Sequence, residues 1–146
     1  MAKFFTLVQA QTLLPEVERL IRCAVSLHEQ HEGAESDLQN LLRRITIAGG
    51  TLLNPSEVVS LRNRSTALAA RLREVVAEIE SLGCQVKDLR LGLVDFPTLF
   101  KGREVLLCWK LGEERIEFWH GLQDGYAGRH RIDEEFLANH KGDAPN

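Results

Sequence analysis

Five residues of types that bind metals or anions lie in the second half of the chain: Asp88, Asp95, His120, Asp124 and Arg129. Two carboxylates and an imidazole can hold a divalent ion such as Zn²⁺, Mn²⁺ or Fe²⁺ and leave coordination positions open for water. We therefore take Asp88, Asp95 and His120 as candidate ligands of a divalent metal ion, the one cofactor that the sequence suggests. The alternative is structural: the aspartates accept loop N–H groups, and His120 is a hydrogen-bonded core residue. We favour it, because the sequence has no His-x-x-x-His or Cys-x-x-Cys spacing.

The glycine-containing run from Gly125 to Arg129 could bind an anion. Its glycines would let backbone N–H groups converge, and the guanidinium would contact a phosphate or carboxylate at two points. The spacing matches neither the P-loop nor the dinucleotide-binding motif, so a plain turn is the alternative. With two aromatic rings as a planar wall, the candidate ligand-binding residues are Trp119, His120, Tyr126 and Arg129.

Cys108 would be a nucleophile only with a base close by and a lowered thiol pKa. The predicted pairing of its strand places Cys108 and His120 on opposite faces, although a bulge or a three-residue loop would bring them together. His28 and His31 are three residues apart, whereas the helical zinc-protease motif needs histidines four apart. We interpret these two histidines as polar positions at the edge of a helical seam.

The first half of the chain predicts two long helices. Thr6 and Gln9 form a capping-box pattern that starts a short helix, and Pro15 should end or kink it, so that a longer helix begins at Pro15 or Glu16. That longer helix should be continuous, with a kink near Gly33 as the alternative. Its apolar stripe repeats every seven residues at Val17, Ala24, His31, Leu38 and Ile45.

Asn54, Pro55 and Glu57 predict the start of the second long helix, which Gly83 should terminate. Its seam comprises Leu61, Ser65, Leu68, Leu72, Val75, Ile79 and Leu82. Two such helices would form an antiparallel, coiled-coil-like hairpin. A lone pair leaves much of each stripe exposed to water, so we expect a homodimer through the helices.

After Gly83 the apolar period falls to two, which predicts a small antiparallel β unit. Cys84–Asp88 and Leu93–Phe96 are short strands, the second ended by Pro97. Residues 104–110 and 115–121 form a hairpin with a two- or four-residue loop. Its predicted pairs are Val105 with His120, Leu107 with Phe118, and Trp109 with Ile116.

These elements predict an α+β fold in one structural domain. Residues 1–83 are the helical hairpin region, and 84–137 are the β unit with a C-terminal loop. Residues 138–146 are a polar tail that should fray.

Several motifs together are similar to one protein family: Gly83–Asp88, Gly92–Pro97, Gly102–Val105, Trp119-His120 and Gly125–Arg129. Over about residues 4–132 the chain resembles the uncharacterised bacterial family called domain of unknown function 2203. The resemblance implies no established reaction, cofactor or partner.

The composition argues against several classes of protein, including those that bind nucleic acid or span a membrane. Hydrophobic residues make up 44% of the chain and charged residues 27%, which is typical of a globular protein. The formal net charge of -3, without a basic cluster, argues against nucleic acid as a partner. No apolar run is long enough to span a membrane, and no signal peptide is evident. The number of cysteines is three, and an odd number suits a reducing compartment, in which they remain thiols. We therefore expect a cytoplasmic protein.

Two functions remain. We favour a non-catalytic module for interaction, assembly or small-ligand binding, which self-associates through its helices. Its β unit would present Trp119, His120, Tyr126 and Arg129 to a protein partner or a small anionic ligand. The alternative is a metal-dependent, hydrolase-like enzyme in which Asp88, Asp95 and His120 hold the ion and Arg129 positions an anion.

Overall fold

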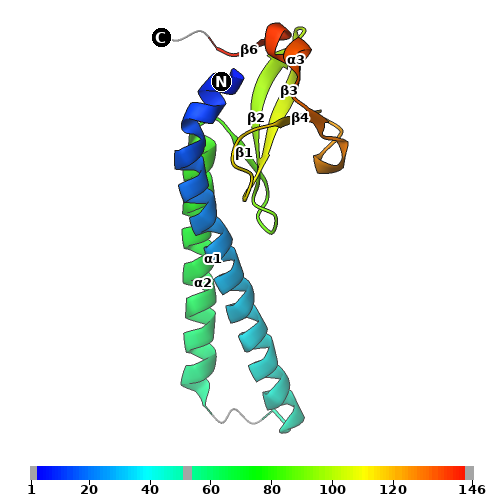
Figure 1. Cartoon of the computed structure of the whole chain (residues 1–146). Coiled ribbons are helices and arrows are strands. Elements are labelled where there is room, and N and C mark those ends of the chain that lie inside the picture. Colours follow the sequence, from blue (N-terminus) through cyan, green and yellow to red (C-terminus); the bar gives the residue numbers. More distant parts are fainter. Residues whose placement is uncertain (1–2, 51–53, 144–146) are drawn as a thin grey trace.

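Two long helices are followed by an antiparallel sheet in the computed structural model, which describes residues 3–50 and 54–143 (Figure 1). Helix α1 spans Leu7–Ile47 and helix α2 spans Pro55–Ser81, and the two lie side by side. The sheet packs beside the end of the helix pair that holds the start of α1. The predicted α+β class is confirmed. Among the described residues, no helix combines the length and the apolar character needed to cross a membrane.

Helix α1 is one continuous helix. The predicted capping box is present: the Gln9 N–H donates to the Thr6 hydroxyl (3.1 Å), and the Thr6 N–H donates to the Gln9 side chain (2.9 Å). The predicted break at Pro15 is wrong, whereas continuity through Gly33 is confirmed. A proline inside a helix costs about 3 kcal/mol. Burial of Leu14 and Val17 on either side of it contributes about 1.5–3 kcal/mol each, which offsets that cost.

Helix α2 begins and ends where the sequence predicts. Asn54 is its N-cap residue and Pro55 its first residue, although the Asn54 side chain accepts from the Ser56 hydroxyl and not from a helix N–H. Gly83 follows the helix with a φ of 105°, a conformation that favours glycine. Of the predicted seam, Ser65 and Ile79 are buried, and the five others are partly buried: Leu61, Leu68, Leu72, Val75 and Leu82.

Six strands form one antiparallel sheet with the order β1-β2-β3-β4-β5, and β6 pairs with β2. The strands are β1 (Gln85–Asp88), β2 (Leu93–Phe100), β3 (Arg103–Lys110), β4 (Phe118–Gly121), β5 (His130–Arg131) and β6 (His140–Lys141). Between β4 and β5 lies the short helix η1 (Tyr126–Gly128), and α3 (Glu134–Asn139) precedes β6. Strands β2 and β3 are joined by the two-residue turn Lys101–Gly102, whose φ angles of 52° and 80° match a type I′ hairpin.

Pro97 lies inside β2, so the prediction that it ends that strand is wrong. Pairing with β1 reaches only to Asp95 and pairing with β6 starts only at Leu99, so Pro97 falls in the gap between them. There its carbonyl accepts from the Phe5 N–H (2.7 Å). Because only alternate residues of an antiparallel ladder bond to a given neighbour, the missing proline N–H leaves no strand unpaired.

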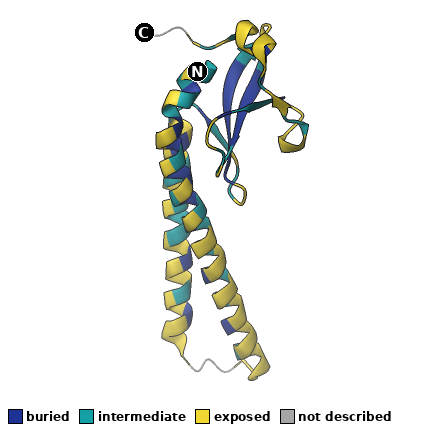
Figure 2. Cartoon of the chain, in the orientation of Figure 1, coloured by how far each residue is buried: buried dark blue, intermediate teal, exposed yellow. Residues whose placement is uncertain are grey.

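The two faces of the sheet have different roles. The face toward the helices carries Val94, Phe96, Leu107 and Trp109, all fully buried against apolar residues of α1 such as Ile21. Figure 2 shows this buried region between the sheet and the upper part of the helices. Successive strand residues point to opposite faces. The residues between these four therefore lie on the face turned away from the helices, which includes the candidate site.

The C-terminal segment is held against the start of α1. His140 Nε2 accepts from the N–H of Leu7, the first residue of α1 (3.0 Å). The Asp143 N–H donates to the Phe4 carbonyl (2.9 Å), and the Phe4 N–H donates to the Asp143 carboxylate (3.1 Å). The predicted fraying of the tail is therefore wrong for residues 138–143, because their polar groups have partners. Residues 144–146 lie outside the described residues.

The His140 contact predicts a measurable stability effect. Replacing His140 with alanine removes the acceptor for the Leu7 N–H, so His140→Ala should lower the free energy of unfolding by about 1–2 kcal/mol in urea denaturation. Lys141→Ala, at an exposed neighbouring position, is the control and should change it little. If the two substitutions lowered the free energy of unfolding equally, the hydrogen bond between His140 and Leu7 would not be what stabilises the start of α1.

Candidate functional site

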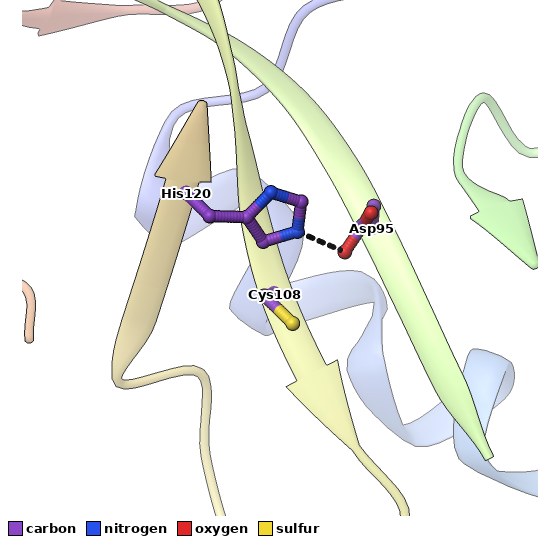
Figure 3. Close-up of side chains that lie close together, drawn as sticks. All are labelled: Asp95, Cys108 and His120. Atoms are coloured by element: carbon purple, nitrogen blue, oxygen red, sulfur yellow. Dashed lines mark hydrogen bonds and ion pairs between the residues drawn. The ribbon is translucent and has the colours of Figure 1, made fainter. Parts of the chain in front are cut away.

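Three side chains of metal-binding types meet on the face of the sheet turned away from the helices (Figure 3). Asp95 lies on β2, Cys108 on β3 and His120 on β4, and one potential ligand atom from each lies within 4.8 Å of the others. The three residues are only 2%, 1% and 3% exposed. Three adjacent strands thus bring carboxylate, thiol and imidazole together in a buried cluster.

The register of β3 and β4 creates this cluster, and it differs from the predicted one by a single residue. Leu106, not Val105, lies opposite His120, and Cys108, not Leu107, lies opposite Phe118. A one-residue shift moves every side chain of a strand to the other face. The prediction that Cys108 and His120 point apart is therefore wrong.

The connection between β3 and β4 explains the shift. It runs from Leu111 to Glu117 and is longer than the predicted loop. Trp109 Nε1–H donates to the Glu113 carbonyl (2.9 Å), which closes the first turn of the connection. Ile116 leaves the sheet: its N–H donates to the Gln11 side chain of α1 (2.9 Å) and its own side chain is buried in the core. The predicted pair of Trp109 with Ile116 is therefore absent.

The neighbours of the two ring nitrogens of His120 show which of them carries a hydrogen. Nδ1 lies 2.8 Å from the Gly121 carbonyl oxygen, and because a carbonyl can only accept, Nδ1 must carry the hydrogen. Nε2 lies 3.2 Å from Asp95 Oδ1, on a carboxylate that also accepts. A proton or a metal ion must lie between these two acceptors, since two lone pairs would otherwise face each other in a buried site.

Cys108 is a protonated thiol in the metal-free cluster. Burial raises the pKa of the Cys108 thiol to about 12, and the neighbouring Asp95 carboxylate adds to the rise. A nucleophilic cysteine needs a lowered pKa and a base. Here burial raises the pKa of the thiol, and His120 Nε2 faces the Asp95 carboxylate, so the cluster argues against nucleophilic catalysis even though Cys108 and His120 share a face.

A small cavity of about 160 Å³ adjoins the cluster. Tyr126 and Leu122, both exposed, lie at its edge. Its remaining lining residues are Lys87, Leu93, Asp95, Leu106, Cys108, His120 and Gly125. A ligand in this cavity would contact Asp95, Cys108 and His120 and would otherwise lie mostly against apolar side chains.

Of the predicted metal ligands, the structure brings Asp95 and His120 together and leaves Asp88 out. Asp88 Oδ1 accepts from the N–H groups of Arg90 (2.8 Å) and Leu91 (3.1 Å) and so caps the turn after β1. Asp124 has a similar role, because its carboxylate accepts from the Gly121 N–H (3.1 Å). The structural interpretation is therefore confirmed for Asp88.

The predicted ligand-binding residues do not form one surface. His120 and Tyr126 line the same cavity. Trp119 points to the opposite face of the sheet, where its ring stacks with Phe136 at 5.1 Å. Arg129 forms an ion pair with Glu113 (2.7 Å) and lies against the rings of Phe118 and Tyr126.

Two functional contacts have no clear signal in the sequence: those of Cys108 and of Glu113. The sequence patterns predict Cys108 only as a nucleophile, on the face opposite His120, and correct alternation along β3 and β4 is the signal that would place it beside His120. Glu113, the partner of Arg129, was assigned to a turn, and no local pattern indicates an ion pair between residues 16 positions apart.

The family model described as "Uncharacterized conserved protein (DUF2203)" matches residues 3–132. Asp95, Cys108 and His120 all lie within the matched segment. No curated protein and no solved structure matches the chain.

The thiols should differ in reactivity. Partly exposed Cys23 should react with iodoacetamide in the folded protein, whereas buried Cys84 and Cys108 should not. Burial raises the pKa of Cys84 to about 11 and that of Cys108 to about 12, so at neutral pH both remain protonated thiols, which react slowly. Peptide mass mapping measures the labelling, and urea-unfolded protein, in which all three should react, is the control. Rapid labelling of Cys108 in the folded protein would contradict the described burial.

Proposed function

Because the chain belongs to the DUF2203 family, whose description names no activity, we propose a function from the site itself. The protein binds a divalent metal ion through Asp95, Cys108 and His120, and Zn²⁺ is the ion that we favour. The bound ion presents an open coordination position to a small ligand. Hydrolysis is the reaction class that such a site would support, with the small ligand as its substrate or its product.

One observation carries this proposal: two buried acceptor atoms, His120 Nε2 and Asp95 Oδ1, face each other at 3.2 Å. Nitrogen and oxygen ligands each lie about 2.0–2.2 Å from Zn²⁺, so two of them on a tetrahedral ion are about 3.3 Å apart. A proton alone would also satisfy this pair, but it gives no role to Cys108. A metal ion engages all three groups, and the mixed sulfur, nitrogen and oxygen set suits Zn²⁺.

The surroundings of His120 support the same proposal. Histidine ligands usually donate their second ring N–H to a carbonyl or carboxylate, which fixes the tautomer and the orientation of the ring. The Gly121 carbonyl accepts from Nδ1 in this way and leaves the Nε2 lone pair directed into the cluster.

Three protein ligands are typical of catalytic zinc sites, which keep a fourth position for water or substrate. The Asp95 carboxylate and a Cys108 thiolate would balance the two positive charges of the ion. An ion held by these residues would lower the pKa of a bound water and so would supply hydroxide for hydrolysis. The cavity beside the cluster gives a small substrate access to that position.

The metal proposal predicts one Zn²⁺ per chain in protein purified without a chelator or a histidine tag. Native mass spectrometry measures the bound metal, and competition with a chromophoric chelator measures its affinity. Asp95→Asn, Cys108→Ser and His120→Ala should each weaken binding by at least about a hundredfold, because each removes one of only three ligands.

Asp88→Asn is the matched control and should bind Zn²⁺ as the wild type does, because Asp88 caps a turn outside the cluster. Circular dichroism shows whether each variant is folded. If the folded wild type takes up none of Zn²⁺, Co²⁺, Mn²⁺ or Fe²⁺, the proposal is wrong. If Cys108→Ser binds as tightly as the wild type, the ligand set is wrong.

A second proposal concerns the helices: α1 and α2 form a coiled-coil-like antiparallel hairpin that self-associates as a homodimer. Its support is the uncovered end of the helix pair, which extends past the sheet (Figure 2). Ile47, Val59 and Leu42 near that end are 80%, 55% and 36% exposed. A second hairpin would cover such residues in a four-helix bundle. We place the protein in the cytoplasm, where its three unpaired cysteines would stay reduced.

The homodimer proposal predicts twice the chain mass in native mass spectrometry and sedimentation at micromolar concentration. The double variant Ile47→Lys, Val59→Lys should be monomeric, because two charges would be buried in the shared interface. Val8→Lys, at a residue 75% exposed near the other end of α1, is the control and should stay dimeric. A monomeric wild type would exclude self-association.

A further inference from the structure

Strand β1 contains a β-bulge beside the metal cluster. Val86 pairs with Val94 and Asp88 pairs with Leu93, so Lys87 is an extra residue without a partner on β2. A bulge redirects the side chain of its extra residue, and bulges are frequent next to active sites. Here Lys87 lines the cavity that contains Asp95, Cys108 and His120.

Lys87 is the basic residue of this cavity. Every other lining side chain is apolar, aromatic, a glycine or a member of the cluster. No residue in the described part of the chain forms a salt bridge with Lys87. Arg129, the residue predicted to position an anion, is paired with Glu113 instead. The bulge thus places Lys87 at the cavity, where its positive charge can position an anion in place of Arg129.

The charges and the size of the cavity define a ligand class. With the divalent ion balanced by Asp95 and a Cys108 thiolate, Lys87 leaves one positive charge, which matches a monoanion. The walls formed by Leu93, Leu106 and Leu122 suit a short alkyl chain. A cavity of about 160 Å³ is smaller than the roughly 300–1,000 Å³ of pockets that hold drug-sized ligands, so the ligand must be small.

We propose that the site binds a short-chain monocarboxylate, with its carboxylate between the open coordination position of the metal and Lys87 and its alkyl chain against the three leucines. This inference rests on the proposed metal function. A phosphate dianion fits less well, because it would leave an excess negative charge and has no apolar part.

The test uses the full chain loaded with Co²⁺, whose visible absorption reports its coordination. Butyrate should change the spectrum of the wild type saturably. Lys87→Met should weaken butyrate binding at least tenfold without changing Co²⁺ affinity, and Lys87→Arg should restore most of the binding. Lys101→Met, at the turn between β2 and β3, is the control and should bind butyrate as the wild type does.

Each other result has a distinct meaning. If the wild type does not bind Co²⁺, the metal function fails and this inference falls with it. If Co²⁺ binds but butyrate does not change the spectrum, or Lys87→Met binds butyrate unchanged, only the carboxylate inference is wrong. Tighter binding of inorganic phosphate than of butyrate would overturn the proposed ligand class.

Discussion

Burial of one face of the sheet against α1 is the constraint on which the rest of this structure depends. Trp109, Phe96 and Leu107 fill the space between sheet and helix, and all three are fully buried. Because strand residues alternate between faces, this packing directs Cys108 and Asp95 to the opposite face. The apolar core therefore determines where the polar cluster lies.

The connection after β3 carries this constraint to the next strand. Trp109 is held by its bond to the Glu113 carbonyl, and Ile116 is drawn into the core beside α1. Strand β4 can pair with β3 only after Glu117, which places His120 beside Asp95. Packing between helix and sheet thus sets the distance between two functional groups on the outer face.

A buried cluster of this composition is costly for a protein without a functional reason. Desolvation of a carboxylate and an imidazole is repaid only when every lone pair has a partner, and apolar residues in their place are often at least as stabilising. Apolar residues at positions 95, 108 and 120 would avoid this desolvation cost. Polar residues at these positions are what the ion and the small ligand proposed above would require.

The sequence by itself determined the features that depend on neighbouring residues. Thr6 and Gln9 mark the start of α1, and Asn54 and Gly83 mark the two ends of α2. Alternating apolar residues mark the strands. These signals can be read locally because caps and periodicity act within a few positions. Asp95 and His120 were recognised as site candidates from their types alone.

Only the tertiary structure decided what depends on distant contacts. The continuity of α1 through Pro15 rests on burial beneath the sheet. The register that brings Cys108 into the cluster is tied to a hydrogen bond between Ile116 and Gln11, 105 positions apart. The tail likewise is held by His140 and Leu7, 133 positions apart. Local patterns carry no record of such pairs, because their free energy arises only when the folded chain brings the two segments together.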